Sequence, residues 1–574
     1  MYRRVLAFDF DGTLARDGAV PSSLQETLTK LHNAGFALFL VTGRRYNGLN
    51  LPWLNHLFEG IVWENGAVVS RTATQEVYLP FGYIEPTLIV ELEDRHIPLE
   101  NGMAIVSTWS QHLDQVWEAI RAWGGDAMIV HNKGAVMILP AGAAKGSGLE
   151  YLLRLCGYSP RNVIAFGDGE NDVSLLQMGE MGVTVSDGVA RLKEFADMVA
   201  DGPGPQGIQA FLEQHLLAET RPPLISRHER WIPIGYDADE APVNLPGSQL
   251  AGGNLGIFGD SGTGKSWIAS LLAEGMHLGG YQTLLIDLEG DFHGLNTLPR
   301  VVVFGDDGVE LPSPSTALTF LQSTANSVVL ELYRTPVELR EPYISELLQG
   351  LALLRAVKFR PHWVVLEEAQ NYLYSANTRL NEAMARMMPG GGWAIVTYRP
   401  DWLPESLLAR LDSCIVSCLG RPEPAEVVQR LFNIPQDISL AGIPAEHALC
   451  GGQIVHVRSS LRRVPHIRHV YKYLDLPLPR HKRFYFATAR GPLGIEAASL
   501  ADFIQILTEL PMESLVFHHR RGDFVAWTAT SLGDDVLAAQ LGKLTRRTLT
   551  GEALRAAILK RAVSRYEEIA VLAR

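Results

Sequence analysis

The sequence contains little cysteine and no long apolar run. Its four cysteines are Cys156, Cys414, Cys418 and Cys450, a number and spacing that argue against a disulfide framework or a thiolate metal site. No uninterrupted apolar stretch approaches the roughly 18 residues of a membrane span, and the chain opens in a strand pattern rather than a signal peptide. We therefore expect a cytoplasmic protein with no membrane partner.

An excess of basic charge is also lacking. The formal net charge is −13, which argues against a surface that coats nucleic acid. A locally basic pore or groove remains compatible with it, because net charge is a sum and electrostatic attraction is local. At 574 residues the chain is too long for one hydrophobic core, and about three or four domains are expected.

What the sequence does contain is a complete phosphate-binding loop between an apolar segment, 255–258, and a helical pattern. Its positions are Gly259, Asp260, Ser261, Gly262, Thr263, Gly264, Lys265 and Ser266. Backbone N–H groups of such a loop cradle a triphosphate, the lysine reaches the β- and γ-phosphates, and the hydroxyl ligates magnesium. The loop predicts an ATP site; a chance glycine-rich turn is the alternative.

Paired carboxylates follow the first apolar segment, 4–8. Asp9 and Asp11 are two residues apart, which places them on the same side of a strand end. One could attack a phosphoryl group while the other protonates the leaving oxygen. Taken alone, the pair could also be an ordinary strand-to-turn signal.

Further polar groups follow two other apolar segments, 37–41 and 162–166. Thr42 follows the first, and the acidic cluster from Asp168 to Asp172, which suits a hard cation, follows the second. Lys145 precedes a helical pattern. Strands that alternate with helices and end in polar groups predict a parallel α/β sheet with its site at the carboxyl edge.

These motifs, in this order over residues 1–215, resemble the haloacid dehalogenase superfamily, in the subfamily with an inserted cap, here about 66–140. The resemblance implies that Asp9 is the nucleophile of an aspartyl-phosphate mechanism and Asp11 the general acid and base. It implies that Thr42 and Lys145 bind the phosphoryl group. It also implies a magnesium site formed by Asp9, the Asp11 backbone carbonyl, Asp168 and Asp172, with Asn171 in support.

The cap of such an enzyme selects the substrate, and its sequence does not name one. Trp109, Trp117, His131 and Lys133 are candidates for substrate contact. A tryptophan at helical spacing belongs more often to a core than to a binding site.

A second acidic motif follows the apolar segment 363–366. Glu367 and Glu368 predict a Walker B pair, in which the first acid supports magnesium and the second polarises the attacking water. The pair could instead begin a solvated helix. Another apolar segment, 393–396, ends at Thr397.

The order of these motifs over residues 229–475 resembles the HerA/FtsK superfamily of P-loop ATPases. The resemblance implies ATP hydrolysis, a ring of subunits (a hexamer), and double-stranded DNA as the partner of that ring. Three departures are visible. Glu367 stands where Asp is common, Tyr398 stands where Gln is common, and the usual N-terminal β-barrel is replaced by the first domain.

The predicted fold class is multidomain α/β. It comprises a Rossmann-like core with an α+β cap, a linker at 216–228, a RecA-like ATPase domain, and a small α+β accessory domain at 476–574. In the last domain we expect a strand at 484–487, a helix capped by Ser499 and a strand at 514–518. Docking is its expected role.

The two sets of motifs leave three hypotheses for the function. In the first, a DNA-translocating ATPase ring carries a phosphatase for nucleic-acid ends or nucleotides. In the second, the phosphatase acts on a small phosphorylated metabolite, and an ATP-binding platform regulates it. In the third, the ring is a nucleotide-dependent interaction platform without catalysis. We favour a bifunctional phosphatase and ATPase.

Overall fold

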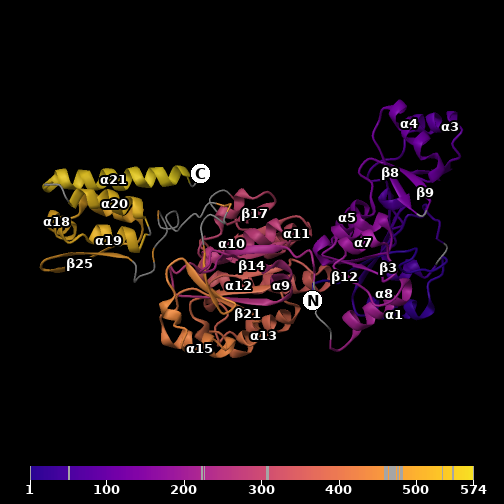
Figure 1. Ribbon diagram of the computed structural model, residues 1–574. Coiled ribbons are helices and arrows are strands. Elements are labelled where there is room, and N and C mark those ends of the chain that lie inside the picture. The colour runs from indigo at the N-terminus through magenta and orange to yellow at the C-terminus, as the bar shows by residue number, and fades with distance from the viewer. Residues whose placement is uncertain are drawn as a thin grey trace.

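The computed structural model describes residues 2–49, 52–132, 134–220, 224, 226–305, 309–457, 463–464, 474, 478, 483–532, 534–545 and 549–572. Three bodies lie in a row, with the first domain and its raised cap at one end and the C-terminal domain at the other (Figure 1). Within the described residues, no helix is both long and apolar enough to cross a membrane.

The first domain is built on one sheet in the order β12-β11-β10-β1-β2-β3-β4-β5. The central strand β1 is parallel to both of its neighbours, so the carboxyl ends of these strands meet at one edge. Its strands are β1 (Val5–Asp9), β2 (Ala37–Val41), β3 (Phe58–Trp63), β4 (Val68–Arg71), β5 (Val77–Tyr78), β10 (Val163–Gly167), β11 (Met181–Thr184) and β12 (Met198–Val199). Its main helices are α1 (Ser22–Asn33), α5 (Lys145–Cys156), α6 (Val173–Met178), α7 (Ala190–Phe195) and α8 (Gly204–Leu212).

The cap is a separate antiparallel sheet in the order β6-β7-β9-β8. Its elements are α3 (Pro86–Asp94), β6 (Glu100–Asn101), β7 (Val106–Trp109), α4 (Leu113–Trp123), β8 (Ala127–Asn132) and β9 (Ala135–Pro140). Strands β4 and β5, inside the predicted cap range of 66–140, pair with the core sheet instead. The cap as a distinct layer therefore begins after β5.

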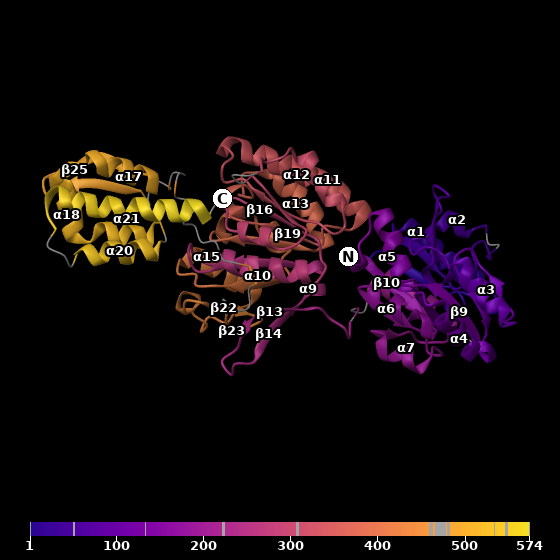
Figure 2. The same cartoon turned by 90° about the horizontal axis from the view of Figure 1, so that it is seen from above.

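The ATPase domain contains a mixed sheet in the order β14-β13-β23-β22-β21-β15-β20-β19-β16-β18-β17, whose central strands are parallel. Helices α11, α12 and α13 cover one face and α9 and α10 the other (Figure 2). The strands are β13 (Trp231–Tyr236), β14 (Pro242–Pro246), β15 (Asn254–Phe258), β16 (Thr283–Asp287), β17 (Val301–Phe304), β18 (Ser327–Glu331), β19 (Trp363–Leu366), β20 (Trp393–Thr397), β21 (Ser413–Val416), β22 (His447–Cys450) and β23 (Gln453–His456). The helices are α9 (Gly247–Gly252), α10 (Lys265–Leu278), α11 (Pro314–Gln322), α12 (Val337–Lys358), α13 (Thr378–Met387), α14 (Glu405–Leu408) and α15 (Pro422–Phe432).

The C-terminal domain packs a hairpin against helices. Its elements are β24 (Phe484–Thr488), β25 (Gly491–Ala497), α17 (Leu500–Glu509), α18 (Met512–Arg521), α19 (Asp523–Thr530), α20 (Asp535–Thr545) and α21 (Gly551–Leu572). The predicted strand at 514–518 is wrong, because this segment lies in α18. Pro511 precedes that helix and Gly522, at φ 75°, ends it, so the flanking residues override the short apolar run.

Candidate functional site

Asp9 and Lys145 lie at the centre of a polar cavity in the first domain. Asp9 ends β1, and Lys145 is the first residue of α5. Lys145 Nζ donates to Asp9 Oδ1 at 2.5 Å and to Asp172 Oδ1 at 2.6 Å, and all three side chains are at most 4% exposed. The cavity has a volume of about 180 Å³. Its walls include Asp9, Asp11, Arg44, Met137, Lys145, Asp168 and Asn171.

Burial and charge set the protonation of this cluster. Burial raises the pKa of Asp9 well above its ordinary value, and the Asp172 carboxylate adds to the effect while Lys145 opposes it. Burial acts to lower the pKa of Lys145, but Asp172 and Asp9 outweigh it, so the net pKa is raised. The lysine therefore stays cationic, beside two carboxylates, where a phosphoryl group would need positive charge.

The same carboxylates fit a magnesium ion. Oxygen atoms of Asp9, Asp168 and Asp172 lie within 4.8 Å of one another, and magnesium prefers oxygen donors of this kind. Asp172 Oδ2 also accepts from the backbone N–H groups of Asp168 at 3.0 Å and Gly169 at 2.9 Å. Gly12 has φ 92°, and a Cβ there would lie 2.1 Å from Asp168 Oδ2. Only glycine leaves room for that carboxylate.

Asp11 is held by an arginine to which the sequence motifs assigned no role. Arg44 donates from Nε to Asp11 Oδ2 at 2.8 Å and from Nη2 to Asp11 Oδ1 at 2.6 Å. The hydrogen bond that Arg44 donates to Asp11 contributes most to the raised pKa of Arg44. The buried Thr42 supports this loop, because its Oγ1 accepts from the Arg44 backbone N–H at 3.1 Å. The signal available in the sequence was the position of Arg44, three residues beyond the end of β2 at Val41.

Arg44→Gln should lower the phosphatase kcat/KM by about 10²-fold, because the bidentate contact that orients Asp11 over the cavity is lost. Steady-state hydrolysis of p-nitrophenyl phosphate would measure the effect. Arg45→Gln is the matched control, since Arg45 is exposed and pairs with the exposed Glu100. Equal activities of the two variants would contradict a role for Arg44.

The cap is joined to this cavity through one buried carboxylate and one methionine. Glu64 accepts backbone N–H groups of Tyr46 at 3.1 Å in the core and of Ala104 at 2.8 Å in the cap segment. Met137, on cap strand β9, lines the cavity and its sulfur accepts from Asn65 Nδ2 at 2.9 Å. The cap thus supplies one wall of the site.

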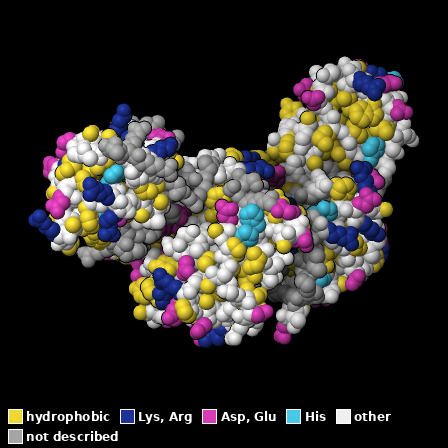
Figure 3. All heavy atoms as spheres, turned by 60° about the vertical axis from the view of Figure 1, so that its left-hand side comes forward, with side chains coloured by type: hydrophobic (Ala, Val, Ile, Leu, Met, Phe, Trp, Pro, Cys, Tyr) yellow, Lys and Arg dark blue, Asp and Glu magenta, His cyan; other side chains and the backbone are white. Residues whose placement is uncertain are grey.

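Of the cap residues predicted for substrate contact, the three that the structure describes do not line the cavity. Trp109 is 58% exposed and Trp117 is 45% exposed, and His131, on β8, is also exposed. Lys133 lies outside the described residues. Hydrophobic side chains gather on the cap surface in Figure 3. Met137 was missed because a buried methionine on a strand carries no signal that separates it from core.

The phosphate-binding loop has the backbone its sequence predicts. Gly262 and Gly264 have φ 82° and 103°, in the left-handed region that favours glycine. Lys265 begins α10 and donates from Nζ to the Asp260 carbonyl at 3.0 Å. Ser266 follows in the first turn of that helix. Thr263 Oγ1 donates a hydrogen bond to the same Asp260 carbonyl at 2.8 Å, which closes the loop.

The two glutamates predicted as a Walker B pair lie in different environments. Glu367 is fully buried, and burial together with Asp287 and Asp291 raises its pKa well above the ordinary range. Glu368 has φ 46°, and burial raises its pKa while Lys265 opposes the shift.

Gln370 links Glu368 to the end of β20, a contact that no motif predicted. Its Nε2 donates to Glu368 Oε2, and its Oε1 accepts from Thr397 Oγ1 at 2.5 Å. Thr397 is the last residue of β20. The acid expected to polarise water is therefore connected to the end of the neighbouring strand.

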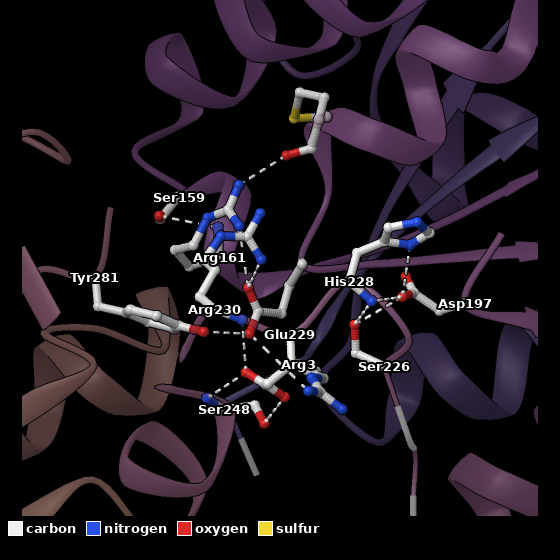
Figure 4. A network of polar contacts seen from close by, with 12 residues as sticks. Arg3, Ser159, Arg161, Asp197, Ser226, His228, Glu229, Arg230, Ser248 and Tyr281 are labelled. Atoms are coloured by element: carbon white, nitrogen blue, oxygen red, sulfur yellow. Dashed lines mark hydrogen bonds and ion pairs between the residues drawn. The ribbon is translucent and has the colours of Figure 1, made fainter. Parts of the chain in front are cut away.

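The two domains meet around a buried glutamate. Glu180 Oε1 accepts the hydroxyls of Tyr2 and Tyr281, each at 2.6 Å, and Oε2 accepts Arg161 at 3.2 Å and Arg230 at 3.1 Å. Figure 4 shows Arg161, Arg230 and Tyr281 close together where the two domains meet. Burial raises the pKa of Glu180, and Arg161 and Arg3 oppose the shift.

Two family models match separate parts of the chain. The model described as haloacid dehalogenase-like hydrolase matches residues 6–92 and 87–212, and the one described as Helicase HerA, central domain, matches residues 232–377. Together they confirm the predicted fusion, and with the sheet they confirm the multidomain α/β class. They support a phosphoric monoester hydrolase and a P-loop ATPase in one chain.

Similar curated proteins cover the first domain. Phosphoglycolate phosphatase 2 of Saccharolobus solfataricus is 26% identical over 37% of this chain and 92% of its own length. Pyridoxal phosphate phosphatase YbhA of Escherichia coli is 24% identical over 38% of this chain and its full length. The chloroplastic endoribonuclease YBEY of Arabidopsis thaliana is 36% identical, but this chain spans only 15% of it.

A solved structure also aligns with the first domain. A haloacid dehalogenase-like hydrolase from Bacteroides thetaiotaomicron is 21% identical over 37% of this chain and 98% of its own, with a TM-score of 0.33 for the alignment.

Proposed function

We propose that this chain hydrolyses both small phosphomonoesters and ATP. It joins a haloacid dehalogenase-like hydrolase domain to a HerA-type P-loop ATPase domain. The observation that carries the first half is the buried Lys145 bridge between Asp9 and Asp172 beside a polar cavity. It provides a nucleophile, a fixed cation and a set of metal ligands at one point.

In the proposed reaction Asp9 attacks the phosphorus atom, and the bond between phosphorus and the ester oxygen breaks. Asp11 gives a proton to the departing oxygen, and it later takes one from the water that cleaves the aspartyl-phosphate. Lys145 holds its positive charge against the transferred group throughout. Magnesium, held by Asp9, Asp168, Asp172 and the Asp11 carbonyl, would neutralise phosphoryl charge when bound.

The cavity favours a small substrate. Its volume of about 180 Å³ is bounded by Met137 of the cap and by Arg44. The names of two similar proteins point to phosphoglycolate and pyridoxal phosphate. We propose a small phosphomonoester with a second polar group. Release of phosphate from both compounds, with and without magnesium, tests this; failure on a broad panel of small phosphomonoesters would contradict it.

For the ATPase domain we propose a ring of subunits, a hexamer, that moves double-stranded DNA. The support is the HerA match together with the link that joins Glu368 to Thr397 through Gln370. Glu368 would polarise water, and Lys265 and Ser266 would hold the phosphates and magnesium. On this hypothesis the phosphatase acts near nucleic-acid ends or nucleotides.

A second hypothesis, a metabolite phosphatase regulated by an ATP-binding platform, is favoured by a specific contact. Helix α5 begins with Lys145 and ends at Cys156, and Lys358 Nζ from the ATPase domain donates to the Cys156 carbonyl at 2.8 Å. Arg360 Nε donates to the next carbonyl, of Gly157, at 2.9 Å. Cations at a helix C-terminus stabilise it. The ATPase domain therefore caps the helix that carries the phosphatase lysine.

Lys358→Met should weaken communication between the two sites. If the platform regulates the phosphatase, a non-hydrolysable ATP analogue changes the phosphatase kcat/KM of the wild-type chain by about fivefold or more, and the variant loses most of that change. Lys30→Met, an exposed substitution on α1, is the control. An analogue effect that persists in Lys358→Met would contradict coupling through this cap.

A further inference from the structure

A second cavity lies where the two domains meet. Its volume is about 330 Å³, and it shares no lining residue with the cavity around Asp9. Tyr2 of the first domain forms one wall, and Arg355, Phe359, Arg386 and Met387 from the ATPase domain form others. The N-terminus lies between the two bodies in Figures 1 and 2, in agreement with the position of Tyr2.

The Arg355 guanidinium has no carboxylate beside it among the described residues that line this cavity. Its Nη2 donates to the Gly391 carbonyl, but its buried Nη1 has no hydrogen-bond partner among the described residues. The group lies 4.8 Å from the Trp393 ring centroid. Burial alone lowers the pKa of Arg355 to about 10, and no carboxylate offsets that burial. A partly buried cation without an anion is costly, and an anion in the cavity would lower that cost through its charge.

A second guanidinium stands at the same cavity. Arg386 pairs with Glu382 at 3.5 Å, and both side chains are mostly exposed, at 79% and 70%. Exposed pairs of this kind contribute little free energy, so Arg386 can turn to a ligand at small cost. Two guanidiniums suit a doubly charged phosphoryl group better than a single carboxylate.

We propose that this junction cavity binds a small phosphorylated molecule, with Arg355 and Arg386 on its phosphoryl group and the Tyr2 and Phe359 rings against its apolar part. The proposal does not depend on the activities proposed above.

The walls of the cavity are tied to the phosphatase core. Asn162 Nδ2 donates to the backbone carbonyls of both Tyr2 and Phe359, each at 3.0 Å. Asn162 directly precedes β10, the strand that leads to Asp168. A ligand in the cavity would therefore contact both domains and the residues that join them.

Equilibrium dialysis of the full-length chain against inorganic phosphate and against phenylphosphonate tests the proposal. The wild-type chain should bind one more anion than either Arg355→Gln or Arg386→Gln. The exposed Arg386 provides a variant that is not expected to disturb folding. Arg379→Gln, an exposed arginine on the same helix α13, should match the wild type. The binding site lost in the variants should bind phenylphosphonate at least about fivefold more tightly than phosphate, because the Tyr2 and Phe359 rings would contact the phenyl group.

Unchanged stoichiometry in both folded variants would overturn the proposal. Equal affinity of the lost component for the two probes would overturn the part assigned to Tyr2 and Phe359. A loss that also appears in Arg379→Gln would overturn the site by showing only general attraction to positive charge.

Discussion

Asp9→Asn should lower phosphatase turnover by at least about 10³-fold, because an amide cannot attack the phosphorus atom. The substitution preserves shape, and Lys145 keeps its contact with Asp172 at 2.6 Å. Release of phosphate from phosphoglycolate would measure the loss. ATP hydrolysis by the same protein should stay within about twofold of the wild type, because the substitution leaves the phosphate-binding loop intact.

Asp17→Asn is the matched control for this variant. Asp17 is exposed and has φ 51°, a conformation that asparagine also adopts readily. It should behave as the wild type in both assays. Loss of both activities in Asp9→Asn, at equal thermal stability, would contradict two independent sites.

Glu368→Gln should lower ATP hydrolysis by at least about 10²-fold while ATP remains bound, because the group that polarises water is lost and the phosphate-binding loop is retained. The Gln370 side chain can still donate to an amide oxygen at this position. Single-turnover hydrolysis and retention of labelled ATP on the protein would measure the two effects.

Glu346→Gln, on the exposed side of α12, provides the comparison for Glu368→Gln and should hydrolyse ATP normally. Rapid turnover in Glu368→Gln would contradict the role proposed for Glu368. The buried acids Glu367, Asp287 and Asp291 would then be the candidates for that role.

The strands that carry the sites were predictable because their signals are local. The segment 37–41 is β2 as predicted, and 363–366 is β19 as predicted. Each is a short apolar run bounded by polar residues, buried on both faces in a parallel sheet.

The features that sequence reasoning missed depend on contacts between distant segments. Lys358 and Arg360 bind backbone carbonyls of the first domain, and a carbonyl acceptor leaves no trace in residue identity. The bond from Arg44 to Asp11 spans 33 positions, and Met137 reaches the cavity only because the cap folds over it. In the C-terminal domain, residues 514–518 read as a strand from hydrophobicity alone, whereas Pro511 and Gly522 define a helix.

The central claim is that an active DNA-moving ATPase is fused to a phosphatase. ATP hydrolysis by Asp9→Asn protein, with and without linear double-stranded DNA, tests it most directly, with Lys265→Ala protein as the inactive reference. We predict that DNA raises the rate by about fivefold or more and that Lys265→Ala shows no turnover in either condition. A basal rate that DNA leaves unchanged would contradict the motor and favour a metabolite phosphatase regulated by ATP.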